Sequence, residues 1–174
     1  MPDYRRVVET LKIVDPTQPL GTELFNALAR ITVSVAIEAV CLRYNSGTRK
    51  VEVYLIQRSP NDTAYPNEWH CPGSVMRPGE SFEDVLGRLV KKEFCANLVS
   101  TRFVANINPS ASEPEARGHF LSIVYLCTLE KEEDLRGKWF AADQLPKQTV
   151  EHHRTRIIPC ALGAFVADNT SICR

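Results

Sequence analysis

No apolar run of this sequence approaches the roughly 20 residues that a membrane-spanning helix requires. Residues 1–15 also lack the apolar stretch of a secretory signal. Neither sign of charge is in excess, because 21 basic side chains balance 21 acidic ones, so no overall field attracts nucleic acid or an anionic membrane. We therefore expect a cytoplasmic protein that binds neither a membrane nor nucleic acid.

The six cysteines form no C-x-x-C pair and lie far apart, which argues against a zinc site or a disulfide framework. Most of them lie inside apolar runs, so we expect buried thiols. No internal repeat, low-complexity segment or Gly/Ser linker divides the 174 residues, and this length suits one domain with a sizeable core. The sequence therefore predicts one compact unit, with short terminal additions at most.

Strand and helix patterns are mixed along the chain. Two helices interrupted by prolines are expected within residues 1–30, as an N-terminal helical extension of a domain formed by residues 31–174. Strands mixed with a few helices imply an α/β sandwich around a mixed sheet. The β-branched and apolar runs predict strands over 31–44, 51–58, 98–107, 119–129 and within 138–146, and helices are expected over 82–96 and 150–167.

One acidic residue, Glu93, falls on the apolar face of the helix expected over 82–96. At about 100° per residue, that face also holds Phe82, Leu86 and Leu89. An ionised carboxylate there is unfavourable unless a cation or several hydrogen-bond donors compensate it. From the spacing alone, an ion pair with a neighbouring arginine, or fraying of the helix before Glu93, is favoured over a metal site.

A turn-rich segment precedes this helix. Pro72-Gly73 and Pro78-Gly79 bracket a tight loop, and glycine lets a ligand approach the backbone while leaving its carbonyl accessible. A backbone carbonyl and a nearby carboxylate are hard oxygen ligands that Mg²⁺ accepts, with water and substrate phosphates in the remaining positions. The segment is therefore either an ordinary loop with two Pro-Gly turns or one side of a magnesium site.

The whole stretch PGSVMRPGESFEDVLGRLVKKEF resembles a Nudix box, the loop-helix motif of enzymes that act on nucleoside diphosphates linked to another group. Glu80, Arg88 and Glu93 fall at the family's spacing. The resemblance implies a Nudix-like α/β/α sandwich around a mixed β-sheet. It also implies a hydrolase that uses Mg²⁺, or Mn²⁺ as the alternative ion, on a nucleotide sugar or another nucleoside diphosphate derivative.

The stretch departs from the family's pattern at four positions. Ser74 stands where the box has glycine, Leu89 and Lys92 replace glutamates, and Cys95 replaces the closing glycine. Two expected metal-binding carboxylates are therefore missing, and the positive charge of Lys92 opposes a second divalent ion nearby. These losses leave an alternative, a catalytically inactive Nudix-fold module that binds a nucleotide or a protein.

The box is most similar to that of GDP-mannose mannosyl hydrolases. That branch also has an Arg-Leu pair where Arg88 and Leu89 stand, and it keeps only the last helix glutamate, at the position of Glu93. It uses one magnesium ion and releases the sugar by substitution at the anomeric carbon. The resemblance therefore implies glycosyl cleavage, for which one ion and positioned arginines stabilise the diphosphate as a leaving group.

The resemblance also assigns individual residues to this chemistry. The carbonyl of Gly73 and the carboxylate of Glu93 would bind Mg²⁺, and Glu133 would be the third ligand. Asp134 would be the catalytic base. Arg58 would bind the diphosphate and stabilise it as it leaves, although by position it is equally a surface arginine at the end of a strand. The acidic segment that holds Glu133 and Asp134 is, without the resemblance, a solvated loop.

The remaining expectations concern support and surroundings. Arg88 would brace neighbouring carboxylates, and Glu80 would support the loop. His119 begins an apolar strand and either lines the substrate site or is structural. His152 and His153, near the last helix, either contact a nucleotide or face water. The N-terminal extension either covers an edge of the domain or forms a homodimer interface.

Overall fold

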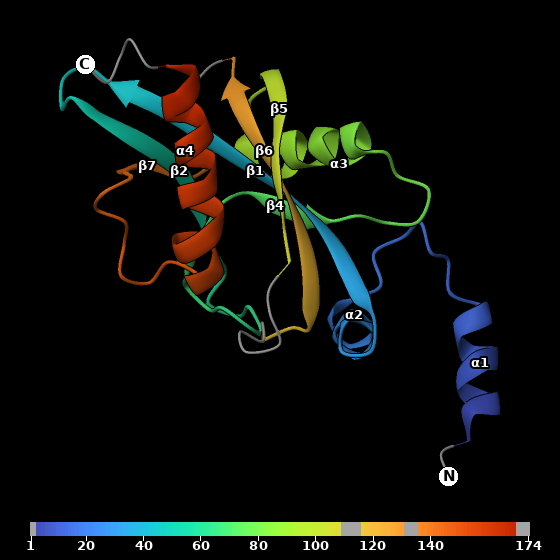
Figure 1. Ribbon diagram of the computed structural model, residues 1–174. Coiled ribbons are helices and arrows are strands. Elements are labelled where there is room, and N and C mark those ends of the chain that lie inside the picture. The colour runs from blue at the N-terminus through green and yellow to red at the C-terminus, as the bar shows by residue number, and fades with distance from the viewer. Residues whose placement is uncertain (1–2, 109–115, 131–135, 170–174) are drawn as a thin grey trace.

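The computed structural model describes residues 3–108, 116–130 and 136–169. Within these residues a seven-stranded mixed sheet forms the centre of the protein (Figure 1). Its main path has the order β3-β2-β1-β6-β5, with β4 paired to β1 and β7 to β2. The β1–β6 pair is parallel, whereas the other pairs are antiparallel. The strands are β1 (Val33–Asn45), β2 (Lys50–Gln57), β3 (Trp69–His70), β4 (Gly73–Val75), β5 (Leu98–Ile107), β6 (His119–Leu129) and β7 (Lys138–Ala141).

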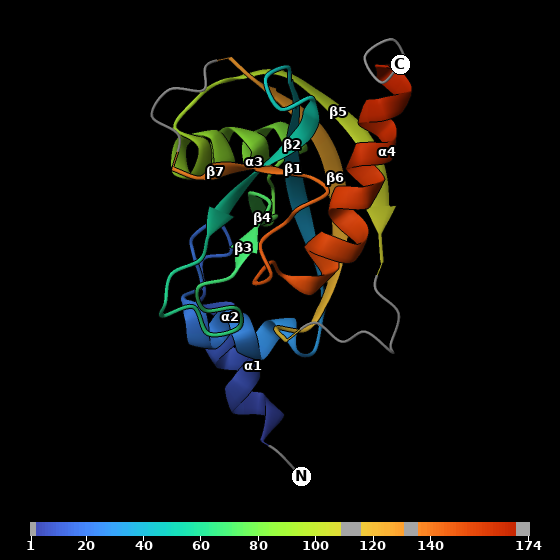
Figure 2. The ribbon, with the colours of Figure 1, turned by 90° about the vertical axis from the view of Figure 1, so that its left-hand side faces the viewer.

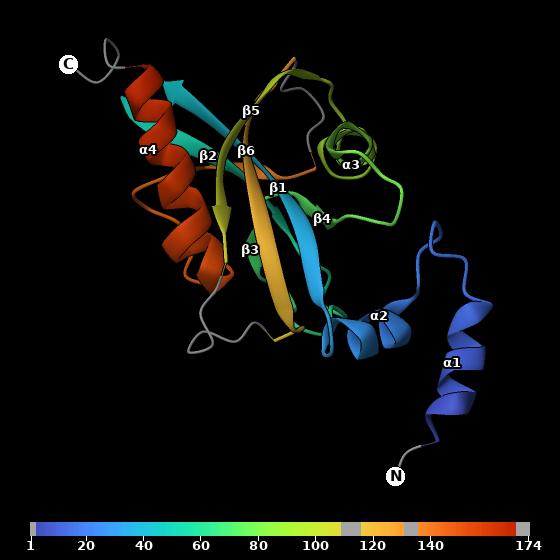
Figure 3. The same cartoon turned by 45° about the vertical axis from the view of Figure 1, so that its right-hand side comes forward.

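Helices cover both faces of the sheet. Figure 3 shows α3 on one side and α4 on the other, so the predicted α/β/α sandwich is confirmed. The bounds predicted for β5 and β6 are also correct. Among the described residues, every helix is too short or too polar to cross a bilayer. The helical segments are α1 (Tyr4–Lys12), α2 (Thr22–Ala29), α3 (Phe82–Leu89), η1 (Val90–Phe94), η2 (His153–Ile157) and α4 (Ile158–Asp168).

The core has one layer on each side of β1. Ile37 of this strand packs in the cluster formed with α3, whereas Val40 packs in the cluster formed with η2 and α4. Successive side chains of a strand point to opposite faces, so a strand that is buried on both faces has a nearly continuous apolar sequence. The thiols of Cys41, Cys71 and Cys127 are buried as predicted, but Cys95 is exposed.

The box helix does not continue as a regular α-helix to residue 96. It begins at a capping box, in which the Ser81 hydroxyl accepts from Asp84 N and the Asp84 carboxylate accepts from Ser81 N. From Val90 it widens into the π-helical turn η1, which ends at Cys95 in the left-handed conformation, with φ of 58°. The wider turn places Phe94 in the core, where its ring stacks on Tyr54 at 5.6 Å.

The N-terminal helices lie at one end of the sheet (Figures 1 and 2). In α2, Ala29 is buried and Phe25 packs with Phe120 of β6, at a distance of 6.4 Å between ring centroids. The other helix, α1, has no buried residue and lies apart from the sheet in all three ribbon views. Residues 1–30 therefore contribute one packed helix, α2, and one exposed helix, α1.

Candidate active site

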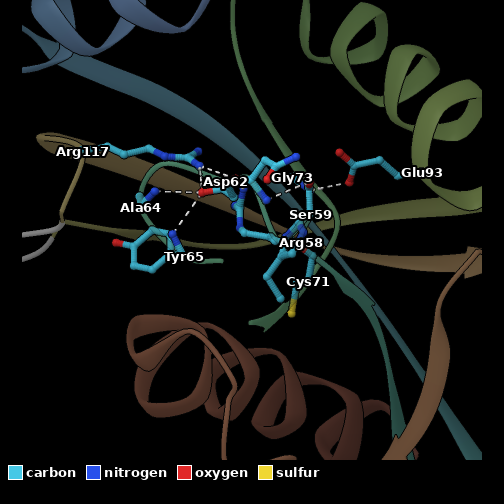
Figure 4. A network of polar contacts seen from close by, with 11 residues as sticks. Arg58, Ser59, Asp62, Ala64, Tyr65, Cys71, Gly73, Glu93 and Arg117 are labelled. Atoms are coloured by element: carbon cyan, nitrogen blue, oxygen red, sulfur yellow. Dashed lines mark hydrogen bonds and ion pairs between the residues drawn. The ribbon is translucent and has the colours of Figure 1, made fainter. Parts of the chain in front are cut away.

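The end of the box helix meets the turn before it through one hydrogen bond. The N–H of Gly73 donates to Oε2 of Glu93 at 3.1 Å (Figure 4). Burial raises the pKa of Glu93 to about 7, against the opposing effects of this hydrogen bond and of the charge of Arg58. The expected ion pair with Arg58 or Arg88 does not form, because these arginines pair with Asp62 and Glu80 instead.

A second acid, Glu38, lies beside the same glycine and is buried. Glu38 projects from the middle of β1, opposite Gly73 in the β1–β4 register, and only 6% of it is exposed. A Cβ atom at Gly73 would overlap the Glu38 carboxylate, so any larger residue at this position would displace the Glu38 side chain. Glu38 was not predicted as a site residue, although a single acid inside the apolar run VSVAIEAV is the same kind of signal as Glu93 on its helix.

Replacing Gly73 with alanine is expected to lower the free energy of unfolding by about 1–3 kcal/mol, because Glu38 must move to admit the methyl group. Gly87 of α3 is the matched control, since a Cβ there meets no atom within 4 Å. Gly87→Ala is expected to be neutral or stabilising by roughly 0.5–1 kcal/mol. Denaturant unfolding measures both, and equal effects of the two substitutions would contradict the close approach.

Arg88 joins the helix to the loop. Its guanidinium donates to both oxygens of Glu80, at 3.0 and 2.6 Å, and to Oγ of Ser74 at 2.5 Å. It also donates to the carbonyl of Val75 at 3.2 Å, and Glu80 accepts in addition from the N–H of Arg77 at 2.8 Å. A bidentate ion pair of this kind fixes the orientation of both side chains. Arg88 and Glu80 therefore hold the shape of the loop, and Ser74 takes part in that brace.

A group of two arginines around one aspartate lies on the other side of Gly73 (Figure 4). Arg58, which directly follows β2, donates to Oδ2 of Asp62 at 3.2 Å. Arg117, which precedes β6, donates from Nη2 to both oxygens of Asp62, at 2.5 and 2.6 Å. Both guanidinium groups lie 5.7 Å from the ring centroid of Tyr65. Of these residues only Arg58 was predicted from the sequence, and Asp62 and Arg117 were not.

Three histidines adjoin this group, of which His70 and His153 are buried and His152 is half-buried. Burial, and then the charge of Arg58, lower the pKa of His70 to about 3 and that of His152 to about 4. Burial also holds the pKa of His153 well below its ordinary value. Nδ1 of His153 accepts a hydrogen bond from the N–H of Cys71 at 3.2 Å. All three rings are therefore neutral near pH 7 and add no positive charge to the arginine group.

These lowered pKa values predict a loss of stability in acid. A histidine that is neutral when folded stabilises the fold above its unfolded pKa of about 6.5, and this contribution is lost as the pH falls toward about 4. Between about pH 7.5 and pH 5, His152→Phe is expected to remove about 1–2 kcal/mol of the pH dependence of unfolding. The exposed His119→Gln is the control, and an unchanged slope in His152→Phe would contradict the prediction.

The candidate residues lie along two cavities. The larger, of about 980 Å³, is lined by Glu38, Gly73, Arg58 and Arg117, among other residues. Glu93 instead lines a smaller cavity of about 330 Å³, together with Lys92, Arg136 and Lys138. Gly73 lines the larger cavity and donates its N–H to Glu93, which lines the smaller one, so these two residues lie between the cavities.

Other predicted site residues have different positions. His119 is exposed, and its Nε2 lies 2.7 Å from Oδ1 of Asn108. It lines neither cavity and alternates along β6 with Phe120 and Ser122, which line the larger one, and its contact with substrate stays a prediction. The predicted third ligand Glu133 and catalytic base Asp134 lie outside the described residues.

The two residues that replace the box glutamates, Leu89 and Lys92, differ in their surroundings. Leu89 is 1% exposed and packs in the core under α3, whereas Lys92 is exposed beside Glu93. Within the described ranges, no three side chains of histidine, cysteine, aspartate or glutamate converge as a metal site. The arrangement suits an ion that takes one or two protein ligands and completes its shell with water and phosphate oxygens.

The family model described as NUDIX domain matches residues 35–159. The chain belongs to the Nudix family. The match includes both candidate acids, Glu38 and Glu93, and both arginines that contact Asp62. It leaves out α1 and α2. No curated protein matches this Nudix chain.

Several solved structures share the Nudix fold with this protein. The crystal structure of Shewanella oneidensis NrtR is 19% identical, covers 77% of this chain and 63% of its own, and has a TM-score of 0.60. The NUDIX domain of Shewanella oneidensis NrtR, complexed with ADP ribose, is 20% identical over 95% of this chain and 99% of its own, with a TM-score of 0.59.

A MutT NUDIX hydrolase from Burkholderia pseudomallei is 21% identical, covers 71% of this chain and 94% of its own, and has a TM-score of 0.57. Identities this low show a shared fold. This chain also spans less than two thirds of the NrtR chain, at 63%.

Proposed function

We propose that this Nudix protein is a magnesium-dependent hydrolase of a nucleotide sugar or another nucleoside diphosphate derivative. Mn²⁺ is the alternative ion. The observation that carries the proposal is Glu93, a carboxylate whose pKa burial raises to about 7, held against the backbone of Gly73. Glu93 is half-buried and has no ion-pair partner among the described residues, so it gains from a bound cation, which offsets the loss of solvation.

The residues present fit one magnesium ion. Glu93 and the Gly73 carbonyl supply oxygen ligands, and Mg²⁺ is commonly held by one or two carboxylates together with phosphates and water. Glu38 lies close enough to Gly73 to hydrogen-bond water at the ion or to act as a further ligand. When bound, the ion would stabilise negative charge on the diphosphate. The core position of Leu89 and the charge of Lys92 support one ion over a cluster.

The arginine group would bind the diphosphate beside this position. Arg58 lines the same cavity as Gly73, and its charge is one of those that act on Glu93. A guanidinium held at the diphosphate stabilises it as a leaving group. The Arg88-Leu89 pair, and Glu93 as the single glutamate left at the metal-binding positions of the box, favour glycosyl cleavage, as in the GDP-mannose mannosyl hydrolases, with Asp134 as the base. The ADP ribose bound by the NUDIX domain of Shewanella oneidensis NrtR supports a ligand of this chemical class.

A second candidate function is a binding module without catalysis. The loss of two helix carboxylates, at Leu89 and Lys92, favours it, because few ligands remain for the ion. The structures of Shewanella oneidensis NrtR support this candidate, since that protein has been solved with a 27mer DNA and its NUDIX domain with ADP ribose. A nucleotide-binding module would keep the cavity and the arginine group but would not need Glu93.

The test is turnover of a panel of nucleotide sugars and ADP ribose with magnesium. We expect product that disappears when magnesium is removed by a chelator. Heavy-oxygen water then identifies the bond, because glycosyl cleavage labels the sugar and phosphoanhydride cleavage labels a phosphate. No product from folded protein at high concentration would rule out the hydrolase. Thermal stabilisation by a panel member in chelator, without turnover, would establish the binding module.

A further inference from the structure

We propose that Arg58 and Arg117, oriented by Asp62, form an anion site that binds a diphosphate without any metal ion. This inference deepens the proposed function, because it adds Arg117 and Asp62 to the same substrate site. The three residues come from separate segments. Arg58 follows β2, Asp62 lies in the loop after it, and Arg117 precedes β6, 55 positions beyond Asp62.

Asp62 holds both guanidinium groups in place. Its Oδ1 accepts hydrogen bonds from the N–H groups of Ala64 and Tyr65, each at 3.0 Å, which fix the carboxylate in its loop. Oδ2 of Asp62 also accepts a hydrogen bond from Arg58, and both carboxylate oxygens accept from Nη2 of Arg117. About a fifth of each arginine side chain is exposed, 20% for Arg58 and 21% for Arg117. Asp62 thus orients the two arginines, and both of its oxygens already accept hydrogen bonds.

The arginines keep donors that Asp62 does not use. A guanidinium carries five N–H donors. The Nε of Arg58 is buried and has no hydrogen-bond partner among the described residues. Within the same part of the chain, the hydrogen bonds of Arg117 use Nη2 alone. Both side chains line the larger cavity, so an anion there would find two partly used guanidinium groups already ordered.

The charge of the group also favours an anion. Two guanidinium cations and one carboxylate leave a net positive charge, and the adjoining histidines are neutral and neither add to it nor cancel it. A planar guanidinium matches two oxygens of a phosphate group, and such charge-assisted hydrogen bonds are about twice as strong as neutral ones. A diphosphate, which offers oxygens on two phosphorus atoms, suits a pair of arginines better than a single carboxylate does.

The experiment measures binding of inorganic pyrophosphate to the full chain in excess chelator, by calorimetry and thermal shift. We expect wild-type protein to bind and Arg117→Gln to bind roughly 10-fold to 100-fold more weakly, the loss expected for charged hydrogen bonds. Arg102→Gln is the matched control, because Arg102 also pairs with an aspartate, Asp168, but on the exposed surface of β5. Equal affinities of wild type and Arg117→Gln, or no binding by wild type, would overturn the proposal.

Asp62→Asn tests whether Asp62 orients the arginines or competes with the ligand for them. The two roles predict opposite changes in the affinity for pyrophosphate. If Asp62 only competes with the ligand for the arginines, removing its charge should strengthen pyrophosphate binding. We expect weaker binding, since the arginines lose the group that orders them, and a strengthened affinity would overturn this role. If Arg117→Gln fails to fold, Arg117→Lys replaces it and is also expected to weaken binding, because lysine lacks the planar fork.

The arginine site and the proposed hydrolase activity can fail separately, because different experiments test them. Pyrophosphate binding in chelator needs neither magnesium nor turnover. A protein that hydrolyses its substrate while Arg117→Gln binds pyrophosphate normally would refute the arginine site alone. A protein that binds pyrophosphate through Arg117 and hydrolyses nothing would refute the hydrolase alone.

Discussion

Glu93→Gln is expected to lower magnesium-dependent turnover by about three orders of magnitude, because it removes the carboxylate that would hold the ion. Glutamine keeps the size of the side chain and an oxygen for the N–H of Gly73, so the fold should survive. Steady-state kinetics on the best substrate of the panel measures the loss. The thermal stabilisation that magnesium gives the wild-type protein should also disappear in Glu93→Gln.

Glu83→Gln is the matched control for this substitution. Glu83 lies on the same helix but is exposed, in the first turn of α3. We expect its turnover and its response to magnesium to equal those of wild type. Should Glu93→Gln retain wild-type turnover, the metal position at Gly73 and Glu93 would be wrong, whatever the substrate.

Magnesium affinity is expected to weaken about tenfold for each pH unit below about 7, since a proton on Glu93 competes with the ion. The raised pKa of Glu93 also sets how the stability of the metal-free protein changes with pH. In metal-free protein, the contribution of Glu93 to stability is fully present below its unfolded pKa and is lost as the pH rises through about 7. Magnesium should reverse that loss, because it binds the ionised carboxylate.

Calorimetric titration of magnesium at about pH 8, 7 and 6 measures this dependence. A companion measurement compares the unfolding of metal-free wild type with that of Glu93→Gln. Above about pH 7 the glutamine variant should be the more stable of the two, and this advantage should fade toward pH 5. An affinity for magnesium that is independent of pH would place the ion on other ligands.

The sequence predicted the sheet and the box because their signals are local. Stretches rich in β-branched and apolar residues indicated the bounds of β5 and β6, and the helical period placed Glu93 on the inner side of its helix. The π-helical turn was not predicted, because nothing in a sequence of ordinary helix formers marks where a turn widens. The strand β4 was missed because its three residues follow a Pro-Gly pair and gain their partner from β1, far back in the chain.

The parts of the site that depend on distant partners were beyond sequence reasoning. Asp62 and Arg117 each have an ordinary sequence context, and only the fold brings them together. Arg58 was singled out through the family resemblance, but its pairing with Asp62 was not predicted. Glu38 carried a usable signal in its apolar surroundings, whereas its contact with Gly73 depends on strand pairing that the sequence does not specify.

The close approach of Glu38 to Gly73 makes the two positions interdependent. A shorter side chain at position 38 would leave room for a methyl group at position 73, whereas glutamate at 38 must move to admit one. Alanine at position 73 should therefore become tolerable once Glu38 is shortened to aspartate or alanine. The double substitution should recover part of the stability that Gly73→Ala loses, as expected for two residues that share one small volume.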